Sequence, residues 1–168
     1  ASLPDCTRQL IRYECEPGQF VEAYLLRPTD AKFIGTLPGV VVLHQTTNST
    51  IDEPAGVSGP DSLQLGLKLA RRGFVVICPR CFLWQDTPSL SEAVKQFHQR
   101  HRRTLGMHKM LYDARRAVDV LAAQPGLDPR RLSAVGHSLG AKEVLYLAAF
   151  DDRIRAAVAS EGGLGLRS

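Results

Sequence analysis

Residues 136–140 read Gly-His-Ser-Leu-Gly, so that one serine lies between two closely spaced glycines. An apolar run that ends at Val135 precedes this pattern, and a segment with helical periodicity follows Gly140. A strand, a G-x-S-x-G turn and a helix in this order predict a nucleophile elbow, which holds a serine hydroxyl above the end of a sheet. Ser138 is therefore the predicted nucleophile. The alternative is a tight glycine turn with an incidental serine.

The two glycines have a physical role in such a turn. Gly136 and Gly140 lack a Cβ atom, so the strand and the helix can approach each other closely. The serine between them can then hold a strained backbone conformation, which is a common property of catalytic positions.

A base for this serine is harder to find. The nucleophile–acid–histidine order places the histidine after the serine. All five histidines precede Ser138, namely His44, His98, His101, His108 and His137. The usual position of the base therefore has no candidate in these 168 residues.

The elements that must position Ser138 alternate along the chain. Strands are predicted at 7–15, 20–27, 40–44, 74–78, 132–135 and 154–159, and helices are predicted after Asp61 or Ser62, at 111–121 and after Gly140. The turn Glu16-Pro17-Gly18 makes the first two strands an antiparallel hairpin. Residues 84–103 are expected to be the least ordered part. The alternation predicts an α/β fold with a mostly parallel sheet, an N-terminal antiparallel hairpin and helices on both faces.

Composition limits the classes of function. The chain has 44% hydrophobic residues and a net charge of +4. No apolar run approaches the length of a membrane span, so we expect no membrane partner. The charge is too small to indicate nucleic acid, and we expect no nucleic acid, no cofactor and no metal. The basic stretch 95–103 is interpreted as a solvated loop, with contact to an anion as the alternative.

Four cysteines allow further alternatives. Cys78-Pro-Arg-Cys81 has redox spacing, but it follows a strand rather than opening a helix, so we do not favour redox chemistry or zinc. Cys6 and Cys15 flank one predicted strand, and a bridge between them stays open.

Further segments resemble the α/β-hydrolase superfamily, and more closely its dienelactone hydrolase and acetyl xylan esterase-like branch. The resemblance lies in Pro38-Gly-Val-Val-Val-Leu-His44, Gln45-Thr46-Thr47, Glu53-Pro-Ala-Gly56, Leu69–Pro79, Gly136–Gly140 and Ser160-Glu-Gly-Gly163. It covers nearly the whole chain but only about the first two-thirds of the family fold. It implies a single truncated α/β-hydrolase domain over residues 1–168, which ends near the sixth strand. The strands that deliver the family's acid and histidine are expected to be missing.

The resemblance also implies roles for individual residues. The amide after the nucleophile belongs to Leu139, and the loop after the third strand makes Gln45 or Thr46 the second oxyanion donor. Glu161 ends the strand beside the elbow strand, where it could act as the base or orient a histidine; an ordinary polar strand end is the alternative. His44 ends its strand at the same edge, and it could act as a base or shape the oxyanion loop.

Two functions remain open. The first is a serine hydrolase of esterase type, which cleaves small ester substrates with an unusual base or with a base supplied in trans. The second is a non-catalytic or vestigial fragment that acts as a binding or oligomerisation module. The predicted strand 154–159 would be an open edge, so we expect a homo-oligomer built on it.

Overall fold

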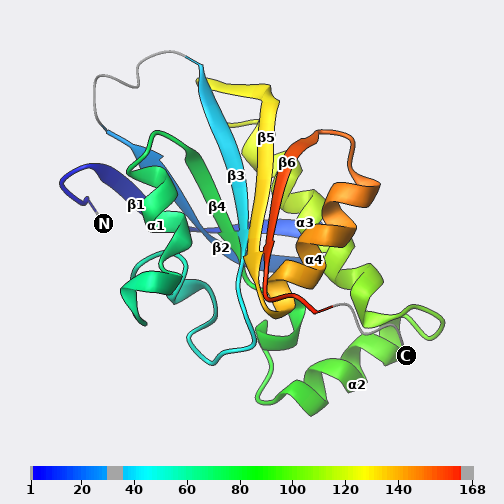
Figure 1. Cartoon of the computed structure of the whole chain (residues 1–168). Helices are drawn as coiled ribbons and strands as arrows, with labels where there is room; N and C mark the ends of the chain where they lie inside the picture. The colour runs from blue at the N-terminus through cyan, green and yellow to red at the C-terminus, as the bar shows by residue number, and fades with distance from the viewer. Residues whose placement is uncertain (1, 30–35, 164–168) are drawn as a thin grey trace.

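Six strands form one sheet in the order β1-β2-β4-β3-β5-β6 in the computed structural model, which describes residues 2–29 and 36–163 (Figure 1). The strands are β1 (Cys6–Glu16), β2 (Gln19–Pro28), β3 (Leu37–Leu43), β4 (Val75–Pro79), β5 (Leu127–His137) and β6 (Ile154–Ser160). Strand β2 pairs antiparallel with both β1 and β4, whereas β4, β3, β5 and β6 run parallel. The predicted sheet and hairpin are therefore confirmed.

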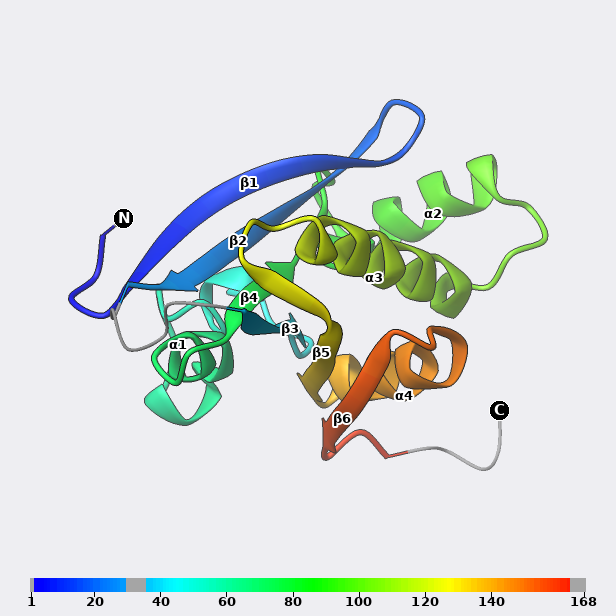
Figure 2. The ribbon, with the colours of Figure 1, turned by 90° about the horizontal axis from the view of Figure 1, so that it is seen from above.

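Helices cover both faces of this sheet. They are α1 (Leu65–Ala70), α2 (Leu90–Arg100), α3 (Gly106–Ala122) and α4 (Leu139–Phe150), and 3₁₀ turns occupy Thr50–Asp52, Asp61–Leu63 and Phe82–Trp84. Side chains alternate along each strand. Val41 and Leu43 pack against α3 and α4, whereas Val40 and Val42 pack on the face of α1. Figure 2 shows α1 and the α3–α4 pair on opposite sides of the strands.

The expectation that residues 84–103 lack order is wrong, because α2 occupies most of this segment. The Ser89 side chain accepts a hydrogen bond from the Glu92 amide at 3.2 Å and caps the helix. Ala93 and Phe97, one turn apart, are buried. Phe97 packs with Cys81, Phe82 and Met110 in a third cluster, which also contacts Leu139 beside the predicted nucleophile.

The helix expected after Asp61 or Ser62 begins later than predicted. These two residues form a 3₁₀ turn, and α1 starts at Leu65 with Gln64 as its capping residue. The helix ends at Ala70, and Gly73 follows three residues later with φ 94°. Among the described residues, no helix has both the length and the apolar character that crossing a bilayer requires.

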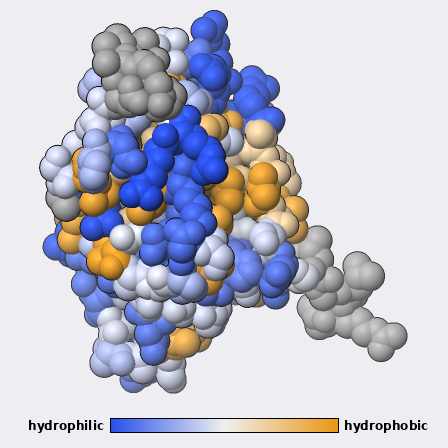
Figure 3. All heavy atoms as spheres, turned by 60° about the vertical axis from the view of Figure 1, so that its left-hand side comes forward, coloured by the Kyte–Doolittle hydropathy of each residue, from blue (hydrophilic) through white to orange (hydrophobic). Residues whose placement is uncertain are grey.

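Strand β6 is the open edge of the described part of the sheet. Its five central residues are exposed, and Val158 retains 57% of its surface. On the face of α1, a groove of about 360 Å³ runs between Phe74, Val135 and Val158. Figure 3 shows hydrophobic side chains gathered at the right-hand edge of that view. The predicted position of strand 154–159 at an edge of the sheet is confirmed.

Candidate active site

Ser138 lies in the strained turn between β5 and α4. Its φ of 54° and ψ of −112° fall in a region that residues with a Cβ rarely adopt. Its amide donates a hydrogen bond to the Ser160 carbonyl at 2.9 Å, and this bond ties the turn to the end of β6. A sharp strand-to-helix turn of this kind holds the serine at the carboxyl edge of the sheet.

The neighbouring glycines are required by close backbone contacts. A Cβ on Gly140 would collide with the Leu43 carbonyl group, and one on Gly136 would collide with the backbone of Gly140. Helix α4 therefore starts directly against the end of β3. The sequence prediction that these glycines permit a close approach is confirmed by this packing.

The loop after β3 faces the start of α4. Gln45 is half-buried, and its side-chain amide donates a hydrogen bond to the Glu53 carboxylate at 2.9 Å. Thr46 is exposed. Leu139 is the first residue of α4, so its amide has no preceding turn to which it can donate. The helix N-terminus adds partial positive charge at the same place.

His44 is buried and uses both ring nitrogens within the fold. Nδ1 donates to the Gln45 carbonyl at 2.7 Å, and Nε2 accepts a hydrogen bond from the Cys81 amide at 3.1 Å. The ring thus joins the loop after β3 to the segment after β4. Trp84 meets it edge-on at 5.4 Å between ring centroids. In this geometry neither nitrogen is free to take a proton from Ser138.

The environment of His44 also disfavours its charged form. Burial lowers the pKa of His44 to about 4; the positive charge of Arg80 acts in the same direction, and the bond to the Gln45 carbonyl opposes the change. The ring is therefore neutral at physiological pH, as the bond from the Cys81 amide requires.

Glu161 lies directly after β6 and beside the elbow. Its backbone has φ 57°, and 80% of its side chain is exposed. Its carboxylate lies 4.0 Å from Nε2 of His137, the residue that precedes Ser138. The next residue, Gly162, packs on Ala141 of α4 so closely that a Cβ would come within 2.7 Å of the alanine Cβ. The carboxylate is therefore held at the same edge as Ser138 and is open to solvent.

The other histidines lie on the segment around α2 and α3. His101 pairs with Glu16 at 3.0 Å, His108 accepts a hydrogen bond from the Leu105 amide at 3.4 Å, and His98 is exposed beside Phe97. Within the described ranges, no three potential ligands converge to hold a metal ion. The structure places none of these three histidines in contact with Ser138 among the contacts it describes.

The cysteines are all free thiols in this structure. Cys6, Cys15, Cys78 and Cys81 are buried and unbridged. Burial raises the pKa of Cys78 and Cys81 above the ordinary range, so both stay protonated and unreactive. The open possibility of a bridge between Cys6 and Cys15 is excluded in this structure.

A buried charged cluster was missed by the sequence prediction. Lys109 lies between Glu16 and Asp113, and its ammonium group is 2.7 Å from Asp113 Oδ1. Glu143 of α4 lies close by, where burial and the negative charge of Asp113 raise its pKa to about 8. Lys109 and Asp113 are four residues apart on a helix whose buried positions are otherwise apolar, and this spacing was the available signal.

The elbow packing predicts a specific effect of adding one methyl group. Gly140→Ala should lower the free energy of unfolding by about 1–3 kcal/mol, because the Cβ collides with rigid backbone rather than with a movable side chain. Urea denaturation measures this change. Gly106→Ala is the control, because its Cβ would meet only Phe82 at 3.7 Å. Equal stability of the two variants would contradict the packing described here.

The buried imidazole predicts a loss of stability in acid. In the unfolded chain His44 binds a proton near pH 6.5, and in the folded chain it does so only near pH 4. The contribution of His44 to the free energy of unfolding is therefore complete above pH 6.5 and is lost as the pH falls to 4. This loss amounts to about 3 kcal/mol. His44→Gln, which keeps an acceptor for the Cys81 amide, should lose this part of the pH dependence.

Urea denaturation of both proteins from pH 7.5 to 4 measures this effect. The difference between them isolates His44, because every other residue is the same in both proteins. Parallel stability curves would show that the His44 ring is accessible to protons.

The family model described as dienelactone hydrolase family matches residues 21–165. A comparison with curated protein sequences finds no match. Solved structures share the fold at low sequence identity. A dienelactone hydrolase-like promiscuous phosphotriesterase from metagenomic libraries is 23% identical, with a TM-score of 0.69 over 98% of this chain and 62% of the other.

Two esterases of known structure share the fold in the same way, again at low sequence identity. A cold-adapted esterase from an Arctic intertidal metagenomic library is 18% identical, with a TM-score of 0.66 over 94% of this chain and 62% of that one. An acetyl xylan esterase from Paenibacillus sp. R4 is 18% identical, with a TM-score of 0.63 over 94% and 54%. The chain thus spans less than two-thirds of the length of these structures. With the family model matching most of its residues, and with its elbow and parallel sheet, the chain belongs to the dienelactone hydrolase family of α/β-hydrolases.

Proposed function

We propose that this chain is the nucleophile-bearing part of a serine hydrolase that cleaves small carboxylic esters. The observation that carries the proposal is the backbone of Ser138, which is held at φ 54° by glycines on both sides and by the bond to Ser160. Backbone strain of this kind persists only when the surrounding structure maintains it, and it clusters at functional positions.

The chemistry requires an oxyanion site beside the nucleophile. As the Ser138 hydroxyl attacks an ester carbonyl, negative charge develops on the carbonyl oxygen. The Leu139 amide at the start of α4 and an amide of Gln45 or Thr46 are the proposed donors. Glu53 holds the Gln45 side chain, and His44 holds the Gln45 carbonyl, so the loop is fixed before the substrate arrives. Fixed donors need no reorganisation during the reaction.

We propose that the base is not one of the residues packed around Ser138 in the single chain and that it is supplied in trans. His44 is committed to two backbone groups, so we assign it the positioning of the oxyanion loop rather than proton transfer. Glu161 is proposed as the acidic group that orients an imidazole, because it is solvent-exposed and follows the strand beside the elbow. An imidazole supplied in trans fits this arrangement, and His98 is an exposed candidate on α2.

Reaction with a fluorophosphonate probe tests the nucleophile. Ser138 should label at least about 100-fold faster than a surface serine, because oxyanion donors alone contribute about that factor. Mass spectrometry of the labelled peptide gives the site and the rate. Ser138→Ala should remove the label, and Ser91→Ala on α2 should leave it unchanged. Labelling of Ser138 at the rate of an ordinary serine would favour the second candidate function.

The second candidate is an oligomerisation module, and the open edge of β6 favours it. We propose that two copies pair their β6 strands antiparallel about a twofold axis at Val158. In this register Arg155 of each copy is placed beside the end of the other copy's β6, where Glu161 follows directly, so that opposite charges approach each other twice. Both side chains are exposed in the single chain.

Sedimentation velocity at micromolar concentration tests this pairing. The chain should sediment as a dimer, and Val158→Lys should convert it to a monomer, because two lysines would face each other across the axis. Val94→Lys, at an exposed position on α2, is the matched control and should stay dimeric. Arg155→Glu should also dissociate the dimer, and adding Glu161→Arg should restore it. A wild-type monomer would contradict the pairing.

A further inference from the structure

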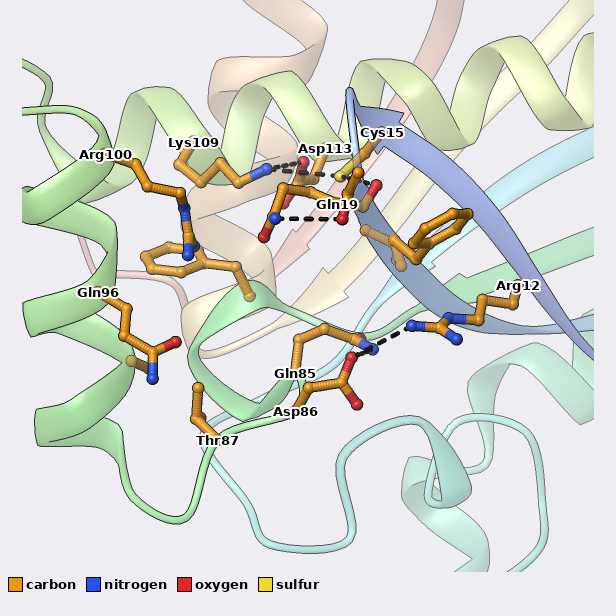
Figure 4. Close-up of a pocket in the computed structure, with 15 residues that line it drawn as sticks. Arg12, Cys15, Gln19, Gln85, Asp86, Thr87, Gln96, Arg100, Lys109 and Asp113 are labelled. Carbon is orange, nitrogen blue, oxygen red and sulfur yellow. Dashed lines mark hydrogen bonds and ion pairs between the residues drawn. The ribbon is translucent and has the colours of Figure 1, made fainter.

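A polar pocket lies between the turn of the β1–β2 hairpin, the segment that follows Phe82, and helices α2 and α3. It has a volume of about 190 Å³, and neither Ser138 nor the loop after β3 lines it. Figure 4 shows Arg100 and Gln96 extending from α2 at the left, Lys109 above them close to Asp113 and Cys15, and Arg12 across the pocket at the right. This hairpin pocket is therefore separate from the candidate active site around Ser138.

Three cations line the hairpin pocket, and two of them are already neutralised. Lys109 lies between Glu16 and Asp113, and Arg12 lies 3.6 Å from Asp86. Arg100 is an exposed residue, and none of the ion pairs formed by residues 2–29 and 36–163 involves it. Arg100 is therefore the lining cation whose guanidinium group is not already in an ion pair, and it can donate two parallel hydrogen bonds to a carboxylate.

Further groups in the pocket complete a site for such an anion. The Thr87 hydroxyl is buried and has no hydrogen-bond partner. The Gln96 amide uses one hydrogen for Glu92 at 3.2 Å and keeps its second hydrogen. Phe20 and Phe82 form apolar walls. A buried hydroxyl without a partner carries a free-energy cost that a ligand oxygen would relieve.

We propose that the hairpin pocket binds a small organic carboxylate with an apolar or aromatic body. The carboxylate pairs with Arg100 and accepts hydrogen bonds from Thr87 and Gln96, and the ring lies between Phe20 and Phe82. The basic stretch 95–103 attracts the anion, and the pocket selects it. This inference does not depend on whether Ser138 reacts.

Benzoate is the probe, and the nuclear magnetic resonance spectrum of ¹⁵N-labelled protein is the first readout. The side-chain amides of Gln19, Gln85 and Gln96 line the pocket, so their NH₂ signals should shift in a saturable way. Benzamide, which has the same ring without the charge, should bind about tenfold more weakly, because it loses the charge-assisted bonds to Arg100. The Ser138→Ala protein should bind benzoate with unchanged affinity.

Variants localise the charge effect. Arg100→Gln should weaken benzoate binding about tenfold, and Thr87→Val should weaken it by a smaller factor. Arg102→Gln removes the same charge from an exposed neighbour that does not line the pocket, and it should leave the affinity nearly unchanged. Circular dichroism confirms that each variant is folded.

Three results would overturn the proposal. The first is the absence of saturable shifts, and the second is equal binding of benzoate and benzamide. The third is an equal loss of affinity in Arg100→Gln and Arg102→Gln, which would show that general surface charge attracts the anion. A fluorophosphonate-reactive Ser138 together with any of these results would leave the proposed hydrolase intact and remove the pocket alone.

Discussion

The contact between Gly140 and the end of β3 is the constraint on which the candidate site depends. Backbone meets backbone there without an intervening side chain, so the start of α4 is fixed relative to Leu43 and His44. The positive φ of Ser138 follows, because the chain must turn within one residue to pass from β5 into this helix. The hydroxyl position is thus determined by the sheet itself rather than by the flexible groups around it.

A second set of contacts fixes the groups on the other side of Ser138. The His44 ring connects the Gln45 carbonyl with the Cys81 amide, and Glu53 holds the Gln45 side chain. These bonds join loops that follow two different strands. The segment after β4 also carries the cluster around Phe82 and Phe97, against which Leu139 packs. The loop after β3, the turn at Ser138 and the α2 region therefore form one connected unit at the carboxyl edge of the sheet.

Local sequence patterns predicted the parts that depend on local physics. The glycine spacing around Ser138, the turn at Gly18 and the apolar strands each contain their own signal, and the sheet contains them as expected. Helix α2 was missed although Ser89 and Glu92 have the spacing of a helix cap. Most residues of α2 are polar, so its two buried positions, Ala93 and Phe97, did not form a recognisable apolar period in the sequence.

Other features could not be inferred from local patterns because they join distant residues. The bond from the Cys81 amide to His44 spans 37 positions, and the contact of Lys109 with Cys15 spans 94. The single tryptophan of the chain lies on one of these connections, since Trp84 touches the His44 ring. Its indole is therefore an intrinsic optical reporter of the loop after β3, because a displacement of the His44 ring changes the surroundings of the one tryptophan in these 168 residues. The state of the candidate site can be followed by emission alone, without a label and without a substrate.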